Sequence, residues 1–385
     1  MDLAILAKEL YTPLDRIERP VLLIEDGVIA SIGMQSEREV PKSRRVLDLE
    51  EAILVPGFID MHIHGGAGRD VMDSAPDALP AVERLLYAHG VTSYFPTTIT
   101  APVDRTLQAL DHLGLAIERA AESQELRARP VGIHLEGPFI SHVRPGVHPT
   151  ADLQRPSLPL FEQMWNASRG TVKVLTIAPE LPGAREVISE ATRRGVCVSM
   201  GHSDADLAQA LAGVDAGISH ATHTFNAMRP LDHRDPGIIG EVLVDERISA
   251  EIIADGIHVD PLVVRLFLRA KGADCAVLVT DATSATGMPN GRYRLGSLEV
   301  EVKDGKCLRD GRLAGSVLTM DKAVRNIIKF ANWDLQHAVR LATLNPARAT
   351  GLANAGQLVV GAPADIIVLN SAGDVVKTFV RGQAA

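Results

Sequence analysis

Eight apolar, β-type runs alternate with amphipathic segments along the middle of the chain, and this alternation constrains the fold more than any other feature. The runs lie at residues 53–62, 91–99, 131–136, 171–178, 195–201, 218–223, 248–254 and 275–280. Helical patterns separate most of them, at residues 78–88, 103–121, 184–194, 204–216 and 261–270. Strand–helix alternation predicts a parallel sheet, and eight units fit an α/β fold of the (β/α)8 TIM-like barrel type.

An open, doubly wound sheet is the alternative arrangement for alternating strands and helices. That fold would be favoured by a glycine-rich phosphate loop after the first strand. The segment His64-Gly65-Gly66-Ala67-Gly68 follows the first run, but it matches neither GxGxxG nor a Walker loop. We therefore predict the barrel, whose active sites lie at the carboxyl ends of the strands.

Both ends of the chain read as short strands rather than as strand–helix units. At the N-terminal end, two apolar runs flank the turn signal Glu25-Asp26-Gly27. At the C-terminal end, strands are expected at 358–360, 366–369 and 375–380. These patterns predict a small β-sandwich domain formed by both termini (residues 1–52 and 351–385) around a barrel at residues 53–350.

Three local patterns refine this scheme. Residues 290–318 interrupt the alternation and contain the turn Asp304-Gly305, which predicts a hairpin insertion. Two helices are expected after it, at 321–330 and 335–343. The pair Ser203 and Asp206 resembles a capping box for the helix at 204–216.

Charge and composition exclude several classes of protein. A net charge of -9 and a pI of about 5.8 argue against nucleic-acid binding, although a few local cations could still hold a phosphate. The three cysteines form no CxxC pair, which indicates a reducing compartment. No apolar run approaches the ~18 residues of a membrane span. Because the first residues also lack a signal-peptide pattern, we expect a cytoplasmic protein without a membrane partner.

Histidines and acids stand at the carboxyl ends of five of the eight runs. Run one closes with His62-Ile63-His64, and alternate strand residues point to the same side. The other four ends carry His134 and Glu136, then His202, then His220 and His223, and finally Asp281. Imidazole and carboxylate groups are the usual ligands of divalent transition metals. One strand histidine is more often a core residue, but five such ends around one barrel mouth predict a metal site.

The chain resembles the amidohydrolase superfamily, and within it the group of N-acetylglucosamine-6-phosphate deacetylases. The resemblance covers nearly the whole sequence. The matching segments are PGFIDMHIHG at 56–65, HLEGPF at 134–139, GHSDA at 201–205, HTFNAM at 223–228, ADGIHVD at 254–260, VTDAT at 279–283 and GAPAD at 361–365. The HLEGP, FNAM and DGIH segments are specific to the deacetylase group.

This resemblance implies a set of metal ligands. Glu136, His202 and His223 would hold the principal ion, and His62 and His64 would add a second ion with Glu136 as a bridge. One or two divalent ions per chain are therefore expected. Zinc is the expected ion, and iron, manganese and cobalt suit the same ligands.

The resemblance also implies catalytic and substrate-binding roles. Asp281 would act as the general base and acid, and His148 would contact the acetamide carbonyl. The remaining substrate-binding residues would hold the phosphate (Asn226, Ala227, Arg234, His258) or line the sugar pocket (Val147, Leu313, Ala314, Gly315). Many relatives carry a Lys-Gly pair shortly before the histidine that aligns with His148. Here the segment is Arg144-Pro145-Gly146-Val147, so the fit of this loop to the substrate differs.

The implied activity is hydrolysis of N-acetyl-D-glucosamine 6-phosphate to D-glucosamine 6-phosphate and acetate, in amino-sugar catabolism. Metal-activated hydroxide would attack the acetyl carbonyl. A deacetylase of another N-acetyl sugar phosphate and an aminoacylase on the same scaffold stay open as alternatives. A catalytically inactive scaffold is a third hypothesis, although such proteins usually lose ligands and here none is missing. The resemblance further implies a homodimer.

Overall fold

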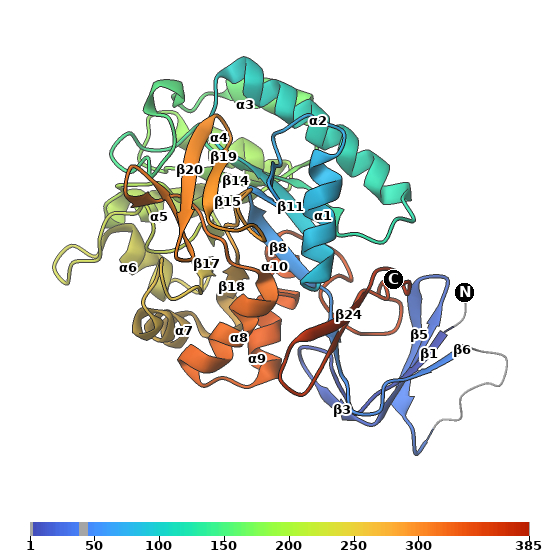
Figure 1. The fold of residues 1–385 in the computed structure, drawn as a ribbon. Helices are drawn as coiled ribbons and strands as arrows, with labels where there is room; N and C mark the ends of the chain where they lie inside the picture. The colour runs from blue at the N-terminus through green and yellow to red at the C-terminus, as the bar shows by residue number, and fades with distance from the viewer. Residues whose placement is uncertain (1–2, 38–44, 385) are drawn as a thin grey trace.

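The computed structural model describes residues 3–37 and 45–384, and its centre is a parallel barrel (Figure 1). Eight strands pair in parallel, each with the next along the chain. They are β8 (Phe58–Ile63), β11 (Val91–Thr98), β13 (Ile133–Glu136), β14 (Val172–Ile177), β15 (Cys197–Met200), β16 (His220–Ala221), β17 (Ser249–Ile253) and β18 (Ala276–Val279). Seven of these strands lie within the predicted runs and β8 extends one residue beyond its run, so the predicted fold class is confirmed.

Polar contacts between the last and first strands hold the barrel closed. A parallel bridge joins Ile63 to Ala282, and the buried carboxylate of Asp60 accepts hydrogen bonds from Thr280 Oγ1 at 2.5 Å and Thr280 N at 3.3 Å. Burial raises the pKa of Asp60 to about 7 in spite of these bonds. These contacts between the first and last strands fix the relative positions of the strand ends that carry His62 and Asp281.

Ten α-helices are assigned within the described residues, and most of them surround the barrel (Figure 1). Seven correspond to predicted helical segments: α1 (Ala78–Ala88), α2 (Val103–Glu122), α4 (Ala184–Arg193), α5 (Leu207–Ala216), α7 (Pro261–Cys275), α8 (Met320–Ala331) and α9 (Leu335–Leu341). Three were not predicted: α3 (Leu158–Ala167), α6 (Gly237–Val244) and α10 (Leu344–Ala349).

The predicted cap of helix α5 is wrong in its position. The N-cap is Asp206, whose carboxylate accepts the Gln209 backbone N–H at 2.8 Å, while Gln209 Oε1 accepts the Asp206 N–H at 3.0 Å. Ser203 instead donates to Glu180 and belongs to the loop before the helix. The capping box is therefore Asp206–Gln209, and the helix starts three residues later than predicted.

Two small sheets are formed by the terminal segments, and one of them combines strands from both ends of the chain. One has the order β24 (Val375–Phe379), β23 (Ile366–Leu369), β7 (Ile53–Pro56), β2 (Glu9–Tyr11) and β3 (Arg16–Glu18). The other has the order β5 (Val28–Met34), β4 (Pro20–Glu25), β1 (Leu3–Leu6) and β6 (Arg45–Asp48). Both sheets contribute to one apolar core, as a sandwich requires. The division of the chain after residues 52 and 350 stays a prediction.

The predicted strand at residues 358–360 is wrong. The backbone N–H of Ala362 donates to the carbonyl of Val359, which closes a turn at this place. Leu358 is buried, but Val360 is 66% exposed, so the three residues do not share one buried surface. Their apolar character alone favoured a strand, whereas the following Gly361, with φ of +87°, permits the turn.

The insertion after the last barrel strand is a four-stranded antiparallel sheet, which confirms and extends the predicted hairpin. Its strands are β19 (Gly291–Leu295), β20 (Leu298–Lys303), β21 (Lys306–Arg309) and β22 (Arg312–Leu313). Its apolar side packs against Ile99, which follows barrel strand β11. Gly296 N also donates to Asp70 in the short hairpin β9 (Gly65–Gly66) and β10 (Arg69–Asp70). The sheet is thus attached to the carboxyl end of the barrel.

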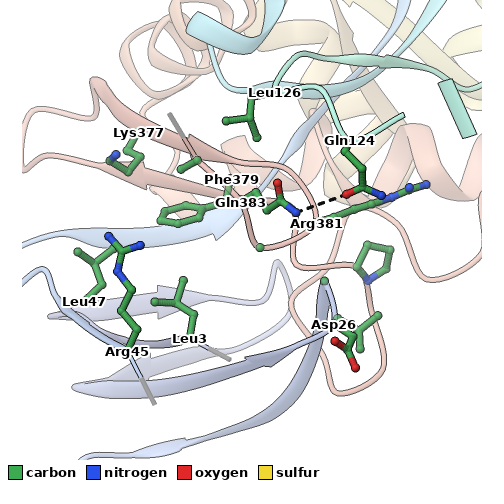
Figure 2. A pocket seen from close by; sticks show the side chains of 15 residues that line it. Leu3, Asp26, Arg45, Leu47, Gln124, Leu126, Lys377, Phe379, Arg381 and Gln383 are labelled. Atoms are coloured by element: carbon green, nitrogen blue, oxygen red, sulfur yellow. Dashed lines mark hydrogen bonds between the residues drawn. The ribbon is translucent and has the colours of Figure 1, made fainter. Parts of the chain in front are cut away.

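A cavity of about 780 Å³ lies between the terminal sheets and the segment that follows α2 (Figure 2). Strands β1 and β6 contribute Leu3 and Arg45, and β24 contributes Phe379. A hydrogen bond between Gln383 and Gln124 crosses its edge. None of the predicted site residues lines this cavity, so it is separate from the barrel mouth. None of the described helices has the length and apolar character that a membrane span requires.

Candidate metal centre and active site

The carboxylate of Glu136 lies at the centre of the predicted metal ligands. Its Oε1 is 3.0 Å from His223 Nε2 and 3.1 Å from His202 Nε2. Its Oε2 is 3.3 Å from His64 Nε2 and 3.6 Å from His62 Nε2. All five side chains are buried at the barrel mouth. One carboxylate therefore faces a different histidine pair with each of its oxygens, which is the arrangement of a bridging ligand.

Several of these residues adopt backbone conformations that are unusual for residues other than glycine. The φ angles of His202, His223 and Asp281 are +47°, +29° and +49°, each two residues beyond a barrel strand. A left-handed conformation at such a residue costs on the order of 1–3 kcal/mol and is concentrated at functional sites in proteins. Contacts with the surrounding residues hold these turns in place, as when the His223 N–H donates to Glu251 at 2.9 Å.

Hydrogen bonds at Nδ1 fix the tautomers of two predicted ligands. His64 Nδ1 lies 3.0 Å from the carbonyl of Thr97, and His202 Nδ1 lies 3.1 Å from the carbonyl of Arg144. Because a carbonyl oxygen only accepts hydrogen bonds, Nδ1 carries the proton in both rings. The lone pair of Nε2 is then free to bind a metal, and in both rings Nε2 faces Glu136.

His62 is held in the same way by a carboxylate. Its Nδ1 lies 3.0 Å from Glu251 Oε2, and its Nε2 is buried without a hydrogen-bond partner in the described part of the chain.

The Nε2 atoms of His202 and His223 lie only 3.1 Å apart. Because His202 Nε2 carries a lone pair, two nitrogens this close need either a cation or a proton of His223 between them. The donor set, nitrogen with carboxylate oxygen, suits a divalent transition metal, so these residues fit one.

The charges of the metal-free cluster support the same interpretation. Burial alone would raise the pKa of Glu136, but His62 and the neighbouring imidazoles hold it well below its usual range. Burial would lower the pKa of His64, yet Asp281 and Glu136 raise it to about 9. Without a metal, protons therefore supply the positive charge that the carboxylates require.

Asp281 lies beside the His62 and His64 pair. Its Oδ1 is 3.2 Å from His64 Nε2 and 3.6 Å from His62 Nε2. Burial raises the pKa of Asp281, but these two imidazoles outweigh it and lower the pKa below its usual value. The carboxylate is therefore ionised at neutral pH and can accept a proton. Gly315 packs against Asp281, since a Cβ there would lie 3.0 Å from the Asp281 backbone oxygen and 3.7 Å from its Oδ1.

His148 has the opposite tautomer to the ligand histidines. The backbone N–H of Thr100 points at His148 Nδ1 across 3.3 Å, and Thr100 Oγ1 lies 2.8 Å from the same atom. A backbone N–H only donates, so Nδ1 accepts and the proton lies on Nε2. Burial and the nearby His202 lower the pKa of His148 to about 4, so the ring is neutral. Its Nε2, 3.4 Å from Glu136 Oε2, is therefore a hydrogen-bond donor at the metal centre.

Two of the predicted substrate-binding segments lie close to this centre. Gly146 packs against both the His202 ring and Ala227, because a Cβ at Gly146 would lie 3.0 Å from His202 Cε1 and 3.7 Å from Ala227 Cβ. Asn226 Nδ2 donates to the His223 carbonyl at 3.2 Å. The insertion also contacts the loop before His148, since an Arg309 Nη1 donates to the Val147 carbonyl. Leu313 and Ala314 precede Gly315 at the end of this insertion.

The two predicted cationic contacts to the phosphate differ in their surroundings. The His258 side chain is only 6% exposed, and its Nδ1 lies 2.6 Å from Asp255 Oδ2. Burial lowers the pKa of His258, but Asp255 and the more distant Asp281 raise it above its usual value. Arg234 is exposed, and its side chain makes no hydrogen bond or ion pair with any residue that the structure describes. The structure therefore does not bring Arg234 into contact with the metal centre.

Two residues of the centre were missed in the sequence. Glu251 is a single acid inside the apolar run 248–254, and a charged residue in a barrel strand was the available signal. Thr100 follows strand β11. Its residue type gave no signal, because a threonine that hydrogen-bonds to a histidine ring looks the same in the sequence as one that only packs in the core. Its role depends on the position of a loop that begins some 40 residues later in the chain.

The sequence comparisons place this site in a known family. Residues 53–385 match the Amidohydrolase family. The chain belongs to the amidohydrolase family. As an amidohydrolase it is a hydrolytic enzyme of a family that is generally metal-dependent, in agreement with the metal-binding geometry of the cluster.

Individual relatives of this amidohydrolase cover nearly its whole length. An N-acetylglucosamine-6-phosphate deacetylase of Bacillus subtilis (strain 168) is 37% identical, over 94% of this chain and 91% of the relative. An N-acetylgalactosamine-6-phosphate deacetylase of Escherichia coli O157:H7 is 36% identical, over 98% of both chains. A mutant N-acetyl-D-glucosamine-6-phosphate deacetylase of Mycobacterium smegmatis, solved with N-acetyl-D-glucosamine-6-phosphate, superposes with a TM-score of 0.93 at 33% identity, covering 100% of this chain and 99% of that one.

Proposed function

We propose that this amidohydrolase removes the acetyl group of N-acetyl-D-glucosamine 6-phosphate, giving D-glucosamine 6-phosphate and acetate, in amino-sugar catabolism. The observation that carries the proposal is the Glu136 carboxylate between two histidine pairs, with an ionised Asp281 and a proton-donating His148 beside it. The similarity to curated N-acetylglucosamine-6-phosphate deacetylases over nearly the whole chain supports the choice of substrate.

We assign the principal metal ion to Glu136, His202 and His223, and a second ion to His62 and His64 with Glu136 as the bridge. When bound, a divalent metal supplies Lewis acidity, which makes water acidic enough to act as a nucleophile near neutral pH. Zinc is the ion that we expect, because imidazole nitrogen and carboxylate oxygen are among its usual ligands. Iron, manganese and cobalt share these ligand preferences.

In this mechanism Asp281 moves one proton twice. Its carboxylate accepts a proton from the water that attacks the acetyl carbon, and it later gives this proton to the amine nitrogen as the C–N bond breaks. The lowered pKa keeps the carboxylate ready to accept at neutral pH. His148 Nε2–H donates to the carbonyl oxygen, where negative charge develops during the attack.

The sugar and its phosphate would be held by residues around the mouth. We assign the phosphate to Asn226, Ala227, Arg234 and His258, and the sugar pocket to Val147, Leu313, Ala314 and Gly315. Phosphate binding away from the carbonyl positions the acetamide for attack, which lowers the entropic part of the barrier. The exposed Arg234 has no competing partner in the described residues and could engage a phosphate in a bidentate way.

Acetate release from a panel of N-acetyl sugars tests the proposal. The panel contains N-acetylglucosamine and N-acetylgalactosamine, each with and without a 6-phosphate, and an N-acetyl amino acid. We expect the highest kcat/KM for N-acetylglucosamine 6-phosphate and little activity without the phosphate. The proposal is wrong if the N-acetyl amino acid or an unphosphorylated sugar is the best substrate.

The galacto-configured substrate is a second candidate with support of its own. The Escherichia coli relative named N-acetylgalactosamine-6-phosphate deacetylase aligns over 98% of both chains, at an identity close to that of the glucosamine enzymes. Both substrates would use the same metal centre and phosphate contacts, and they differ only at C4 of the sugar. A higher kcat/KM for the galactosamine phosphate would select this candidate, and the aminoacylase alternative is tested by the same panel.

We also propose that the protein is a cytoplasmic homodimer. The free cysteines are compatible with a reducing compartment such as the cytoplasm. Light scattering after size-exclusion chromatography tests the oligomeric state, and a monomer at micromolar concentration would contradict it.

A further inference from the structure

Glu251 lies in the barrel wall directly behind the metal centre. It is the third residue of strand β17, its side chain is 0% exposed, and it is neither a proposed metal ligand nor part of the proposed mechanism. Its Oε2 is 3.0 Å from His62 Nδ1 and 2.9 Å from the His223 backbone nitrogen. Its Oε1 is 3.3 Å from His220 Nε2. One buried carboxylate therefore contacts residues of both proposed metal sites.

The backbone N–H of His223 donates to Glu251 Oε2, and this contact fits an ionised acid. An ionised carboxylate only accepts hydrogen bonds, so His62 Nδ1 must carry the proton in its contact with Glu251. The Nε2 lone pair of His62 is then left for a metal, in the absence of any other partner among the described residues. The same oxygen also fixes the backbone of His223, whose φ of +29° needs a constraint.

We propose that Glu251 is a positioning residue that makes His62 a metal ligand and links the second metal site to the first. This inference rests on the proposed metal centre. Carboxylates that accept from the distal nitrogen of a ligand histidine fix its ring and raise its basicity. Through His62 the carboxylate acts on the second site, and through the His223 backbone it acts on the first.

A purely structural role is the competing explanation. Glu251 could simply satisfy His220, which lies in strand β16 and also contacts Ser249 Oγ through Nδ1 at 2.6 Å. That explanation predicts a loss of stability without a selective effect on metal binding. The two explanations can therefore be distinguished by the affinity for the second ion, measured in a variant whose metal-free form is as stable as that of the wild type.

The test is Glu251→Gln, which keeps the size and removes the charge. Its amide oxygen can still accept from His62 and His223, and the tautomer of His220 can change to accept from the amide nitrogen. The affinities of the first and second zinc ion are measured by competition with chelators, and metal content by mass spectrometry. We expect the second ion to bind about 10- to 100-fold more weakly, with the first changed by less than about threefold.

Glu83→Gln is the matched control. Glu83, on helix α1, is also a buried glutamate. Tyr94 and Arg127 contact its carboxylate, and it makes no contact with the ligand set. It should leave both metal affinities unchanged. In a His62→Asn background, adding Glu251→Gln should change the remaining metal affinity no further, because His62 is gone and the amide oxygen still accepts the His223 N–H.

A second measurement uses the wild type and does not depend on the folding of a Glu251 variant. In cobalt(II)-loaded protein, the Nδ1 proton of a metal-bound histidine gives a shifted, exchangeable NMR resonance, and the hydrogen bond to a buried carboxylate should make the His62 proton exchange slowly. Assignment comes from its loss in His62→Asn.

A wild type that binds no second ion overturns the proposed metal centre. A wild type with two ions, together with normal affinities in Glu251→Gln or no slowly exchanging His62 proton, overturns only the role of Glu251.

Discussion

At the scale of single residues, the site divides its histidines by the partner of Nδ1. Where that partner is a carbonyl or carboxylate, as for His64 and His62, Nε2 is left as a lone pair for a metal. Where it is a backbone N–H, as for His148, Nε2 becomes a hydrogen-bond donor. A histidine at this site is thus either a metal ligand or a hydrogen-bond donor through Nε2, and the group that contacts Nδ1 on the other side of the ring decides which.

Asp281→Asn tests the proton transfer. The amide keeps the size of the carboxylate and can approach the same neighbours, but it cannot accept and return a proton. We expect kcat to fall by ~10²–10⁴, with a smaller change in KM and with metal retained at Glu136, His202 and His223. The measurement is kcat, metal content and melting temperature on one preparation. A folded, metal-loaded variant with kcat within a few-fold of wild type would falsify the mechanism.

Thr100→Val tests the tautomer of His148. Valine removes the hydroxyl that lies 2.8 Å from Nδ1 and leaves the backbone N–H, so the ring should be less firmly oriented. We expect kcat to fall by about 5-fold, the effect of losing one neutral hydrogen bond of about 1 kcal/mol, with metal content unchanged. Thr98→Val, at a buried threonine without a side-chain partner in the described residues, is the control and should keep its kcat. Equal losses in both variants would point to packing instead.

Arg234→Ala tests the phosphate contact. The guanidinium is exposed and has no partner among the described residues, so its loss should not affect folding. We expect KM for the phosphorylated sugar to rise by at least about 10-fold, as for a charged hydrogen bond of about 1.5–3 kcal/mol, with little change for the free sugar. His233→Ala, at the exposed neighbouring residue, is the matched control. An equal rise for both sugars would remove the phosphate role.

The sequence predicted which side chains would gather at the barrel mouth, but not how they would be protonated. Residues at the carboxyl ends of strands, such as His62 and Glu136, could be placed because strand periodicity and barrel topology bring these ends together. Thr100 and Glu251 could not, because their roles depend on distances between segments far apart in the chain. The exposed position of Arg234 likewise depends on the path of a loop, which no local pattern determines.

At the scale of elements, the strands were easier to predict than the helices. Barrel strands are buried on both faces and read as continuous apolar runs, so all eight were found. Helix α6 (GIIGEVLV) is also apolar on nearly every side, so it lacks the polar face that makes a helix recognisable. The start of α5 was misplaced because Ser203 and Asp206 have the spacing of a capping box, whereas Ser203 is engaged with Glu180.

Asp206→Ala tests the corrected cap. Removing the carboxylate leaves the Gln209 N–H of the first turn without its acceptor, which should lower the free energy of unfolding by about 1 kcal/mol. Asp206→Asn keeps an accepting oxygen and should cost much less. Because Gln209 and the first turn are exposed at the outer layer, kcat should stay unchanged in both variants. Chemical denaturation measures the difference, and equal stabilities of the two variants would contradict the assigned cap.

At the scale of the whole molecule, one charged cluster links metal binding to stability. In the metal-free protein, neighbouring carboxylates raise the pKa of His64 to about 9 and that of His62 well above its usual value. A raised histidine pKa gives stability that is fully present below about pH 6.5 and is lost as the pH rises through the folded-state value. The lowered pKa values of Glu136 and Asp281 act in the opposite range, because their contribution is lost as the pH falls below about 4.5.

Metal removal should therefore change how stability depends on pH. We expect the melting temperature of the chelated protein to decline from about pH 6.5 to pH 9, with His64 contributing at most about 3 kcal/mol. In the loaded protein the metal replaces these protons, and its binding tightens as the pH rises because fewer protons must be displaced. The difference in melting temperature between loaded and chelated protein should thus widen from pH 6.5 to 9. Chelated protein with both His62→Asn and His64→Asn should lose most of the decline, which separates this cluster from His258, whose raised pKa acts in the same direction. A chelated wild type whose melting temperature stays level or rises over this range would show that the histidines are not held protonated by the carboxylates.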